Sequence, residues 1–161
     1  FSDNGRDMMG DDIPPDEINR VSKENEHFGF PYVHAGAIVD PEFGKGKNIS
    51  DYSPPALALG AHVAPLGIHF YTGKQFPGSY KEQLFVAEHG SWNRTKKSGY
   101  KVAVANVEQG RITKYTPFIT GFMHNETTFG RPVAFAQLND GSLLISDDYA
   151  NVIYRVSYKK N

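Results

Sequence analysis

The sequence predicts an all-β fold, and three observations support this prediction. Helical periodicity is almost absent, whereas apolar and polar residues alternate with a period of two from residue 67 onward. Aromatic residues make up 13% of the chain, and its 16 Gly and 10 Pro are typical of a protein rich in turns. A chain of 161 residues can bury one core, so a single domain is the starting expectation.

Four consecutive segments in the middle of the chain are predicted to form one antiparallel unit. The strands are expected over residues 67–72, 83–89, 100–107 and 111–119, with a turn at Glu108-Gln109-Gly110 between the last two. Together they make an up-and-down meander of about 50 residues, which is the size of one blade of a β-propeller.

The pattern then restarts and gives a second unit. Strands are predicted over 132–138, 142–146 and 152–158, and Asn139-Asp140-Gly141 is a hairpin signal between the first two. This unit has three strands rather than four. A propeller commonly closes its ring with a strand from the opposite terminus, so the missing strand favours a further N-terminal part.

The N-terminal third is predicted to end an earlier blade and to lead into a long connection. Residues 16–21 and 28–32 are typical of a blade's last segments, and residues 36–60 are rich in Gly, Pro, Asp and Lys. Residues 1–35 are predicted to be the end of a blade with an acidic loop, and residues 36–60 an inter-blade excursion. Residues 61–120 are predicted to be a complete blade, and residues 121–161 a final blade that lacks one strand. Propellers need about four to eight blades, so we expect this chain to be a fragment that works with more chain.

Composition excludes several functions. The net charge is −1 and the Lys and Arg residues are scattered, which argues against nucleic-acid binding. No apolar run approaches the roughly 20 residues that a membrane span needs. The absence of Cys excludes disulfides, zinc–thiolate sites and thiol nucleophiles, and it fits a periplasmic or secreted bacterial enzyme.

An acidic segment opens the chain. Carboxylates crowd a Gly- and Pro-containing loop that runs into a strand-like Ile-x-x-Val: Asp3, Asp7, Asp11, Asp12, Asp16 and Glu17. Such carboxylates repel one another, so a cation among them would stabilise the loop, and oxygen-only ligands point to Ca²⁺. The alternative is a solvated acidic loop.

Three further places carry functional side chains. His62 precedes the first complete strand unit and could bond an anionic ligand or act as a base, or simply cap a loop. The octet 87–94 holds Glu88, His89, Trp92 and Arg94 at the end of a strand, where sites are often built; Trp92 could stack on a flat ligand, or it could only fill space between blades. Arg131 lies where the chain enters the last unit. Its position in the repeat is the reason to prefer a functional role for it.

These pieces together resemble the glucose/sorbosone dehydrogenase family, the soluble quinoprotein sugar dehydrogenases, over nearly the whole chain. The octet places the chain nearest the sorbosone dehydrogenase-like branch. The other segments that carry the resemblance are Ser2 to Asp7, Pro15-Asp16-Glu17-Ile18-Asn19, Phe28-Gly29-Phe30-Pro31, Ala64-Pro65, Leu84-Phe85-Val86 and Gly130-Arg131-Pro132.

The resemblance implies a six-bladed β-propeller that holds pyrroloquinoline quinone (PQQ) and Ca²⁺. Gly5 and Arg6 match positions whose backbone carbonyls bind the cofactor's Ca²⁺, and Asp16 and Glu17 match a pair at a separate structural Ca²⁺. Arg131 matches the Arg that pairs with the carboxylates of PQQ.

The chain also departs from the family. Arg6 stands where better-known members have Pro, and the loop before Asp16 is longer. A Lys that contacts the quinone has no clear match, although His89 or Arg94 falls nearby. The family's catalytic His is expected upstream of Phe1.

The function implied is PQQ- and calcium-dependent oxidation of an aldose or related sugar, such as sorbosone or glucose, with hydride transfer from the sugar C1 to the quinone. We expect a small-molecule sugar substrate, an unidentified electron acceptor and a missing N-terminal half of the propeller as partners. The alternatives are a non-catalytic, calcium-stabilised propeller binding module and a Ca²⁺-binding structural module. Arg131 distinguishes these readings, because a place beside a cavity with other cations would favour a cofactor site.

Overall fold

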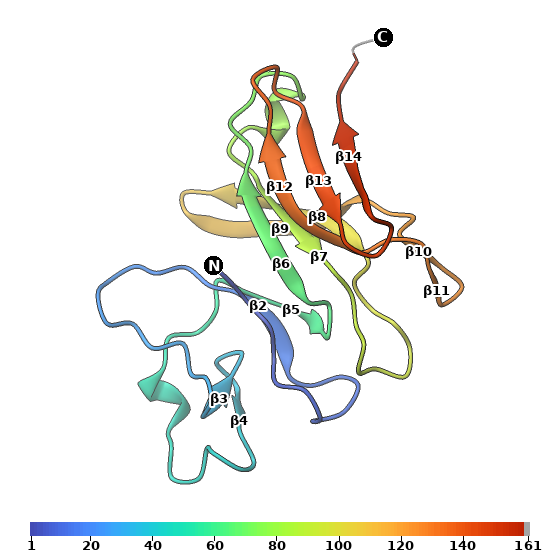
Figure 1. Ribbon diagram of the computed structural model, residues 1–161. Helices are drawn as coiled ribbons and strands as arrows, with labels where there is room; N and C mark the ends of the chain where they lie inside the picture. Colours follow the sequence, from blue (N-terminus) through green and yellow to red (C-terminus); the bar gives the residue numbers. More distant parts are fainter. Residues whose placement is uncertain (160–161) are drawn as a thin grey trace.

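The computed structural model describes residues 1–159 and is built almost entirely of short antiparallel strands (Figure 1). Two short 3₁₀ turns, η1 (Ile49–Asp51) and η2 (Gly78–Tyr80), are the helical elements of this part of the chain. The strands are β1 (Ser2–Asp3), β2 (Pro15–Ile18), β3 (Val33–His34), β4 (Ile38–Val39), β5 (Leu57–Ala61), β6 (Pro65–Phe70), β7 (Leu84–Glu88), β8 (Lys101–Glu108), β9 (Arg111–Ile119), β10 (Met123–His124), β11 (Thr127–Thr128), β12 (Pro132–Gln137), β13 (Leu143–Asp147) and β14 (Val152–Val156).

The predicted four-strand unit is confirmed as a sheet in the order β6-β7-β8-β9. Every neighbouring pair is antiparallel, as short connections between consecutive strands require. The three strands predicted near the C-terminus are also confirmed, in the order β12-β13-β14. Their first hairpin turns at Asp140, whose carboxylate accepts hydrogen bonds from the backbone N–H of Ser142 (3.0 Å) and from its hydroxyl (2.7 Å).

The N-terminal sheet differs from the prediction. It has the order β1-β2-β5, so residues 57–61 form a strand where a long excursion was predicted over 36–60. The sequence Leu-Ala-Leu-Gly-Ala has few β-branched or aromatic residues, and its pairing with β2 is what makes it a strand. Residues 28–32 form no strand; they lead through a turn into the small β3–β4 hairpin.

The first strands of the three main sheets lie side by side, β1 against β6 and β6 against β12 (Figure 1). The Ser2 hydroxyl donates to the carbonyl of Leu66 at 2.9 Å. Gly67 is so close to β12 that a Cβ added there would lie 2.4 Å from the carbonyl oxygen of Val133. Sheets that meet at their first strands are consistent with the blades of a propeller. A closed six-bladed ring remains a prediction.

Two apolar cores fill the spaces between these sheets, and the period of two in β7 explains both. Leu84 and Val86 point to a core with Ile18 and Leu59 of the N-terminal sheet. Phe85, between them in sequence, points to the opposite face and joins the aromatic core beneath β12–β14. In the described residues, no helix has the length and apolar character needed to cross a membrane.

Candidate functional site

Five loops meet at one end of the three sheets. Strand register places them there, because Pro15 pairs with Ala61, Pro65 with Glu88 and Pro132 with Asp147. The connections at this end therefore span residues 4–14, 62–64, 89–100, 129–131 and 148–151. All of the predicted site residues except Glu17 lie in these loops or at the strand end beside them.

A small pocket of about 70 Å³ lies among these loops. We call it the Asp16 pocket; its lining residues are Asn4, Gly5, Asp7, Asp16, His62, Ala64, Gly90, Ser91 and Trp92. The structure therefore brings together three of the predicted site residues, Gly5, Asp16 and His62.

Asp16 connects two loops of this pocket. Its carboxylate oxygens accept hydrogen bonds from the backbone N–H groups of Gly5 and Ala64, each at 2.7 Å. The side chain is buried, and burial raises the pKa of Asp16 while these N–H donors and His62 oppose that rise. Asp16 thereby fixes the backbone whose carbonyl groups were predicted to bind Ca²⁺.

His62 closes the pocket from the β5–β6 connection. Its Nε2 lies 2.7 Å from the carbonyl oxygen of Gly10, and its Nδ1 lies 3.7 Å from a carboxylate oxygen of Asp7. The ring is buried, so the imidazole packs the acidic loop against the sheet end. Trp92 is the opposite case, because 73% of its surface is exposed on the rim of the pocket.

Arg131 and His89 lie next to each other beside the pocket. The Arg131 guanidinium donates from Nε to the carbonyl of His89 (3.1 Å) and from Nη2 to that of Gly90, and it lies over the ring of Tyr100 at 5.4 Å. His89 Nε2 is 2.8 Å from a carboxylate oxygen of Asp148. Arg131 is half-buried and holds the loop after β7, while its Nη1 is not used in these contacts.

Arg94 holds the acidic loop from the outside. Its guanidinium donates to the carbonyl of Asp11 (2.8 Å) and the carboxylate of Asp12 (2.8 Å), while its Nη1 reaches the carbonyl of Lys96 (2.9 Å). The repulsion expected among the carboxylates of this loop is thus relieved by cationic side chains of the chain itself. A role for Arg94 in cofactor binding remains a prediction.

Arg6 and Glu17 lie away from the Asp16 pocket, toward the β3–β4 hairpin. Arg6 forms ion pairs with Asp40 and Glu42, at 2.6 and 2.8 Å. The buried Glu17 carboxylate accepts hydrogen bonds from the side-chain amide of Asn19 (2.9 Å) and the backbone N–H of Ala35 (2.5 Å). Both side chains therefore tie the hairpin to the first sheet, and only the backbone carbonyl of Arg6 is suited to the metal role predicted for it.

Asp40 is the centre of this hairpin. Burial by itself raises the pKa of Asp40, but hydrogen bonds from Arg6, His34 and the backbone N–H groups of Phe43 and Glu42 outweigh burial and hold the pKa well below its ordinary value of 3.8. A carboxyl group with a depressed folded-state pKa stabilises the fold above its unfolded value, and this contribution is lost as the pH falls through the folded-state value.

We therefore expect acid to destabilise the wild-type chain more than Asp40→Asn. The variant should have a lower urea midpoint at pH 7, and the difference from wild type should shrink as the pH falls below 3.8. Urea unfolding followed by circular dichroism over a pH series measures this, with Asp51→Asn, an exposed position, as the control. A constant difference between wild type and Asp40→Asn at every pH would contradict the prediction.

Comparison with known proteins places the chain in a family. A family model described as TrAA12-like matches residues 45–159, which is more than half of the chain. The chain belongs to the TrAA12-like family. This result confirms the resemblance to quinoprotein sugar dehydrogenases, because relatives of this TrAA12-like chain include PQQ-dependent sugar dehydrogenases.

Two curated relatives align with parts of longer proteins. An uncharacterized protein of Borreliella burgdorferi is 48% identical over 99% of this chain and 43% of its own length. A pyrroloquinoline quinone-dependent pyranose dehydrogenase of Coprinopsis cinerea is 32% identical over 62% of this chain and 16% of its own length. The TrAA12-like chain thus spans less than half of the length of either relative.

Solved structures show the same fold. The holo form of the PQQ domain of a Coprinopsis cinerea pyranose dehydrogenase matches 98% of this chain and 49% of its own, with a TM-score of 0.68 and 19% identity. A calcium structure of a Trichoderma reesei carbohydrate-active enzyme of family AA12 matches 95% of this chain and 46% of its own, with a TM-score of 0.74 and 20% identity.

The Asp16 pocket fits a cation better than an organic cofactor. Within residues 1–159 no three His, Asp or Glu side chains gather as a metal-binding cluster, so a cation here would depend on backbone carbonyls as well. Oxygen atoms of the Asn4 and Asp7 side chains and of the Gly5 backbone are the ligands that a hard cation prefers. A pocket of about 70 Å³ is far below the roughly 300 Å³ of a small-molecule site, so these residues could form only one wall of a PQQ site.

The lining of the pocket also includes residues that were not predicted as site residues, among them Asn4 and Ser91. Asn4 and Ser91 line it because their loops cross, and nothing in their local sequence indicates which loop each one meets. For Ser91 the preceding glycine was a signal, because Gly often marks a turn. Gly90 has a positive φ of 99° and turns the chain away from β7.

Proposed function

We propose that this TrAA12-like chain is part of a PQQ- and calcium-dependent dehydrogenase that oxidises an aldose or related sugar, such as sorbosone or glucose, at C1. The observation that carries the proposal is the convergence of Gly5, Asp16 and His62 in one pocket beside the contacting pair His89 and Arg131. These positions were selected from separate parts of the sequence, and family membership links them to quinoprotein chemistry.

The proposed roles follow from the contacts. The backbone carbonyls of Gly5 and Arg6 would bind Ca²⁺, and Asp16 would hold that backbone in place through the N–H of Gly5. Arg131 would pair with a carboxylate of PQQ through its remaining guanidinium N–H groups. The quinone, when bound, supplies the hydride acceptor, and Ca²⁺ polarises its carbonyl groups.

The remaining parts of the site would come from additional chain. The catalytic base is expected upstream of Phe1, in a longer polypeptide that completes a six-bladed propeller. We propose a periplasmic or secreted location for it, in keeping with the absence of Cys.

One observation favours a second candidate, a calcium-stabilised propeller module that binds but does not oxidise. Arg94 already uses its guanidinium on the acidic loop, and Arg131 uses two of its donors on backbone carbonyls. Both arginines that were predicted to bind the cofactor would then be structural.

A titration of this chain with PQQ and Ca²⁺ tests the proposal. We expect Ca²⁺-dependent binding of PQQ, read from cofactor absorbance, and dye reduction with aldoses only when the catalytic base is supplied by additional chain. Arg131→Lys keeps the charge but loses the planar fork, and it should weaken PQQ binding by about tenfold. Arg155→Gln, at an exposed position of β14, is the control and should bind normally.

The two candidates give different results in this titration. A folded protein that includes the additional chain and binds Ca²⁺ but not PQQ would contradict the dehydrogenase and support the binding module. Equal PQQ binding by wild type and Arg131→Lys would remove Arg131 from the proposed cofactor site. Urea unfolding of each variant shows whether the loop after β7 remains ordered.

A further inference from the structure

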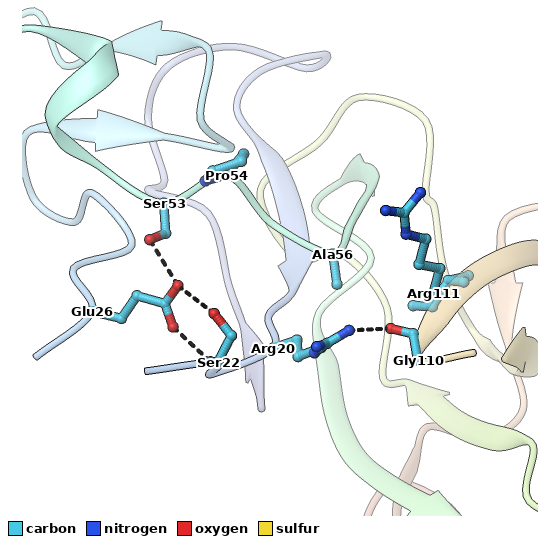
Figure 2. Close-up of a pocket in the computed structure, with 9 residues that line it drawn as sticks. Arg20, Ser22, Glu26, Ser53, Pro54, Ala56, Gly110 and Arg111 are labelled. Carbon is cyan, nitrogen blue, oxygen red and sulfur yellow. Dashed lines mark hydrogen bonds between the residues drawn. The ribbon is translucent and has the colours of Figure 1, made fainter. Parts of the chain in front are cut away.

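A second pocket has a volume of about 460 Å³. Figure 2 shows residues that line it, and the strand order places it at the opposite end of the sheets from the Asp16 pocket. It forms where the chain leaving β2, the segment before β5 and the β8–β9 hairpin meet. We call it the Arg20–Arg111 pocket. All three segments contribute polar side chains to it, namely Arg20, Ser22, Glu26, Ser53 and Arg111.

One wall is held together by Glu26. Its carboxylate accepts hydrogen bonds from the backbone N–H of Ser22 (2.7 Å), the Ser22 hydroxyl (3.1 Å) and the Ser53 hydroxyl (3.1 Å), as Figure 2 shows. The backbone N–H of Ser22 is the largest influence that lowers the pKa of Glu26, so the group remains a carboxylate. Since both hydroxyl protons are directed at Glu26, the lone pairs of Ser22 and Ser53 are left to accept bonds from a ligand.

The other wall carries two guanidinium groups. Arg20 Nη1 donates to the carbonyl of Gly110 at 2.6 Å, which directs this side chain along the pocket. Within residues 1–159 the Arg111 side chain forms no hydrogen bond or ion pair, although Glu108 lies opposite it in the hairpin. The donors of Arg111, and Nε and Nη2 of Arg20, are therefore available to a ligand.

Charge and hydrogen-bonding capacity are thus divided between the walls. The Glu26 carboxylate is already surrounded by donors, so it neutralises neither arginine directly. The arginine wall offers several N–H donors and excess positive charge, and the serine wall offers hydroxyl acceptors. A ligand that satisfies both walls carries an oxyanion at one end and hydroxyl groups at the other.

We propose that the Arg20–Arg111 pocket binds a small hydroxylated anion, namely a monosaccharide that carries a phosphate or carboxylate group. The oxyanion accepts hydrogen bonds from Arg20 and Arg111, and the sugar hydroxyls donate to Ser22 and Ser53. The volume of the pocket is within the range of small-molecule sites. This site does not depend on the proposed dehydrogenase function, because the two pockets share no residue.

Isothermal titration calorimetry with this chain tests the proposal. The probes are glucose 6-phosphate, glucuronate, inorganic phosphate and uncharged glucose; the first two distinguish a phosphate from a carboxylate as the anion. We expect at least one of the two sugar anions to bind, more tightly than inorganic phosphate and far more tightly than glucose. Binding should weaken with added salt, because the contacts are exposed and charged.

Matched variants locate the binding. Arg111→Gln should lower the affinity for the sugar anion by about tenfold or more, as expected for loss of a charged hydrogen bond. Lys114→Gln removes the same charge from an exposed position on the same strand, outside the pocket, and should bind as the wild type does. Both positions are exposed, so both variants should fold.

Three results would overturn the proposal. The first is no heat of binding from either sugar anion with a chain shown to be folded. The second is an equal loss of affinity in Arg111→Gln and Lys114→Gln. The third is equal affinity for inorganic phosphate and for the sugar anions, which would leave no role for the serine wall. Titration with PQQ and Ca²⁺ addresses the other end of the molecule and can succeed or fail independently.

Discussion

Replacement of Asp16 with Asn should destabilise the chain by about 3 kcal/mol, since each buried donor left without a partner costs about 1–3 kcal/mol. Asp16 is buried and accepts one backbone N–H on each oxygen, from Gly5 and from Ala64. An Asn side chain has only one acceptor oxygen, so its NH₂ group would face one of these N–H donors. The isosteric substitution should therefore cost nearly as much as Asp16→Ala.

Urea unfolding measures this cost, and Ca²⁺ affinity gives the functional consequence. Asp7→Asn is the matched control for stability, because it removes the same charge from the same pocket, where the carboxylate is 45% exposed and lies 3.7 Å from Nδ1 of His62. That control should change stability by less than about 1 kcal/mol. If Asp16→Asn is as stable as Asp7→Asn, the connection between the two loops is not what orders the pocket.

Replacement of Phe85 with Ala should destabilise the chain by about 4 kcal/mol, within the 3–5 kcal/mol typical of a buried Phe. Phe85 has no exposed surface, and its ring packs edge-on against Phe118 at 4.8 Å between centroids. It also contacts Tyr71 and Tyr80, each at 6.1 Å. The cavity left by Ala would lie in the centre of the aromatic core, where surrounding rings cannot all move in to fill it.

Phe70→Ala is the control for this prediction. Phe70 lies on the neighbouring strand β6 with 51% of its surface exposed, so its truncation should cost about 1 kcal/mol or less. Urea unfolding of both variants at one pH gives the comparison. Equal losses would mean that the core between β6–β9 and β12–β14 contributes no more to stability than the surface does.

Local sequence was sufficient for the strands of the two C-terminal sheets. The alternation in β7 and β8 exists because each strand separates two cores, so it is written in consecutive residues. The Asn-Asp-Gly hairpin was also predictable, because the Asp140 carboxylate bonds only two residues away. The β-sheet order followed, since short connections leave few alternatives to antiparallel neighbours.

The candidate site was predictable in part. Gly5, Asp16 and His62 were singled out separately, and the structure places them around one pocket. The partners of the charged residues could not be predicted in the same way. Arg94 reaches the acidic loop across 83 positions of sequence, and Arg6 reaches Asp40 across 34.

By itself the sequence determined the all-β class, the strands of the β6–β9 and β12–β14 sheets and the family to which the chain belongs, because these depend on periodicity and on ordered motifs. Only the tertiary structure decided that residues 57–61 are a strand, since that segment has little β-propensity and is ordered by pairing with β2. It also decided which cations neutralise the acidic loop and placed two arginines across a pocket from two serines. Strand periodicity is a property of neighbours in sequence, whereas hydrogen-bond partners and pockets depend on segments that only folding brings together.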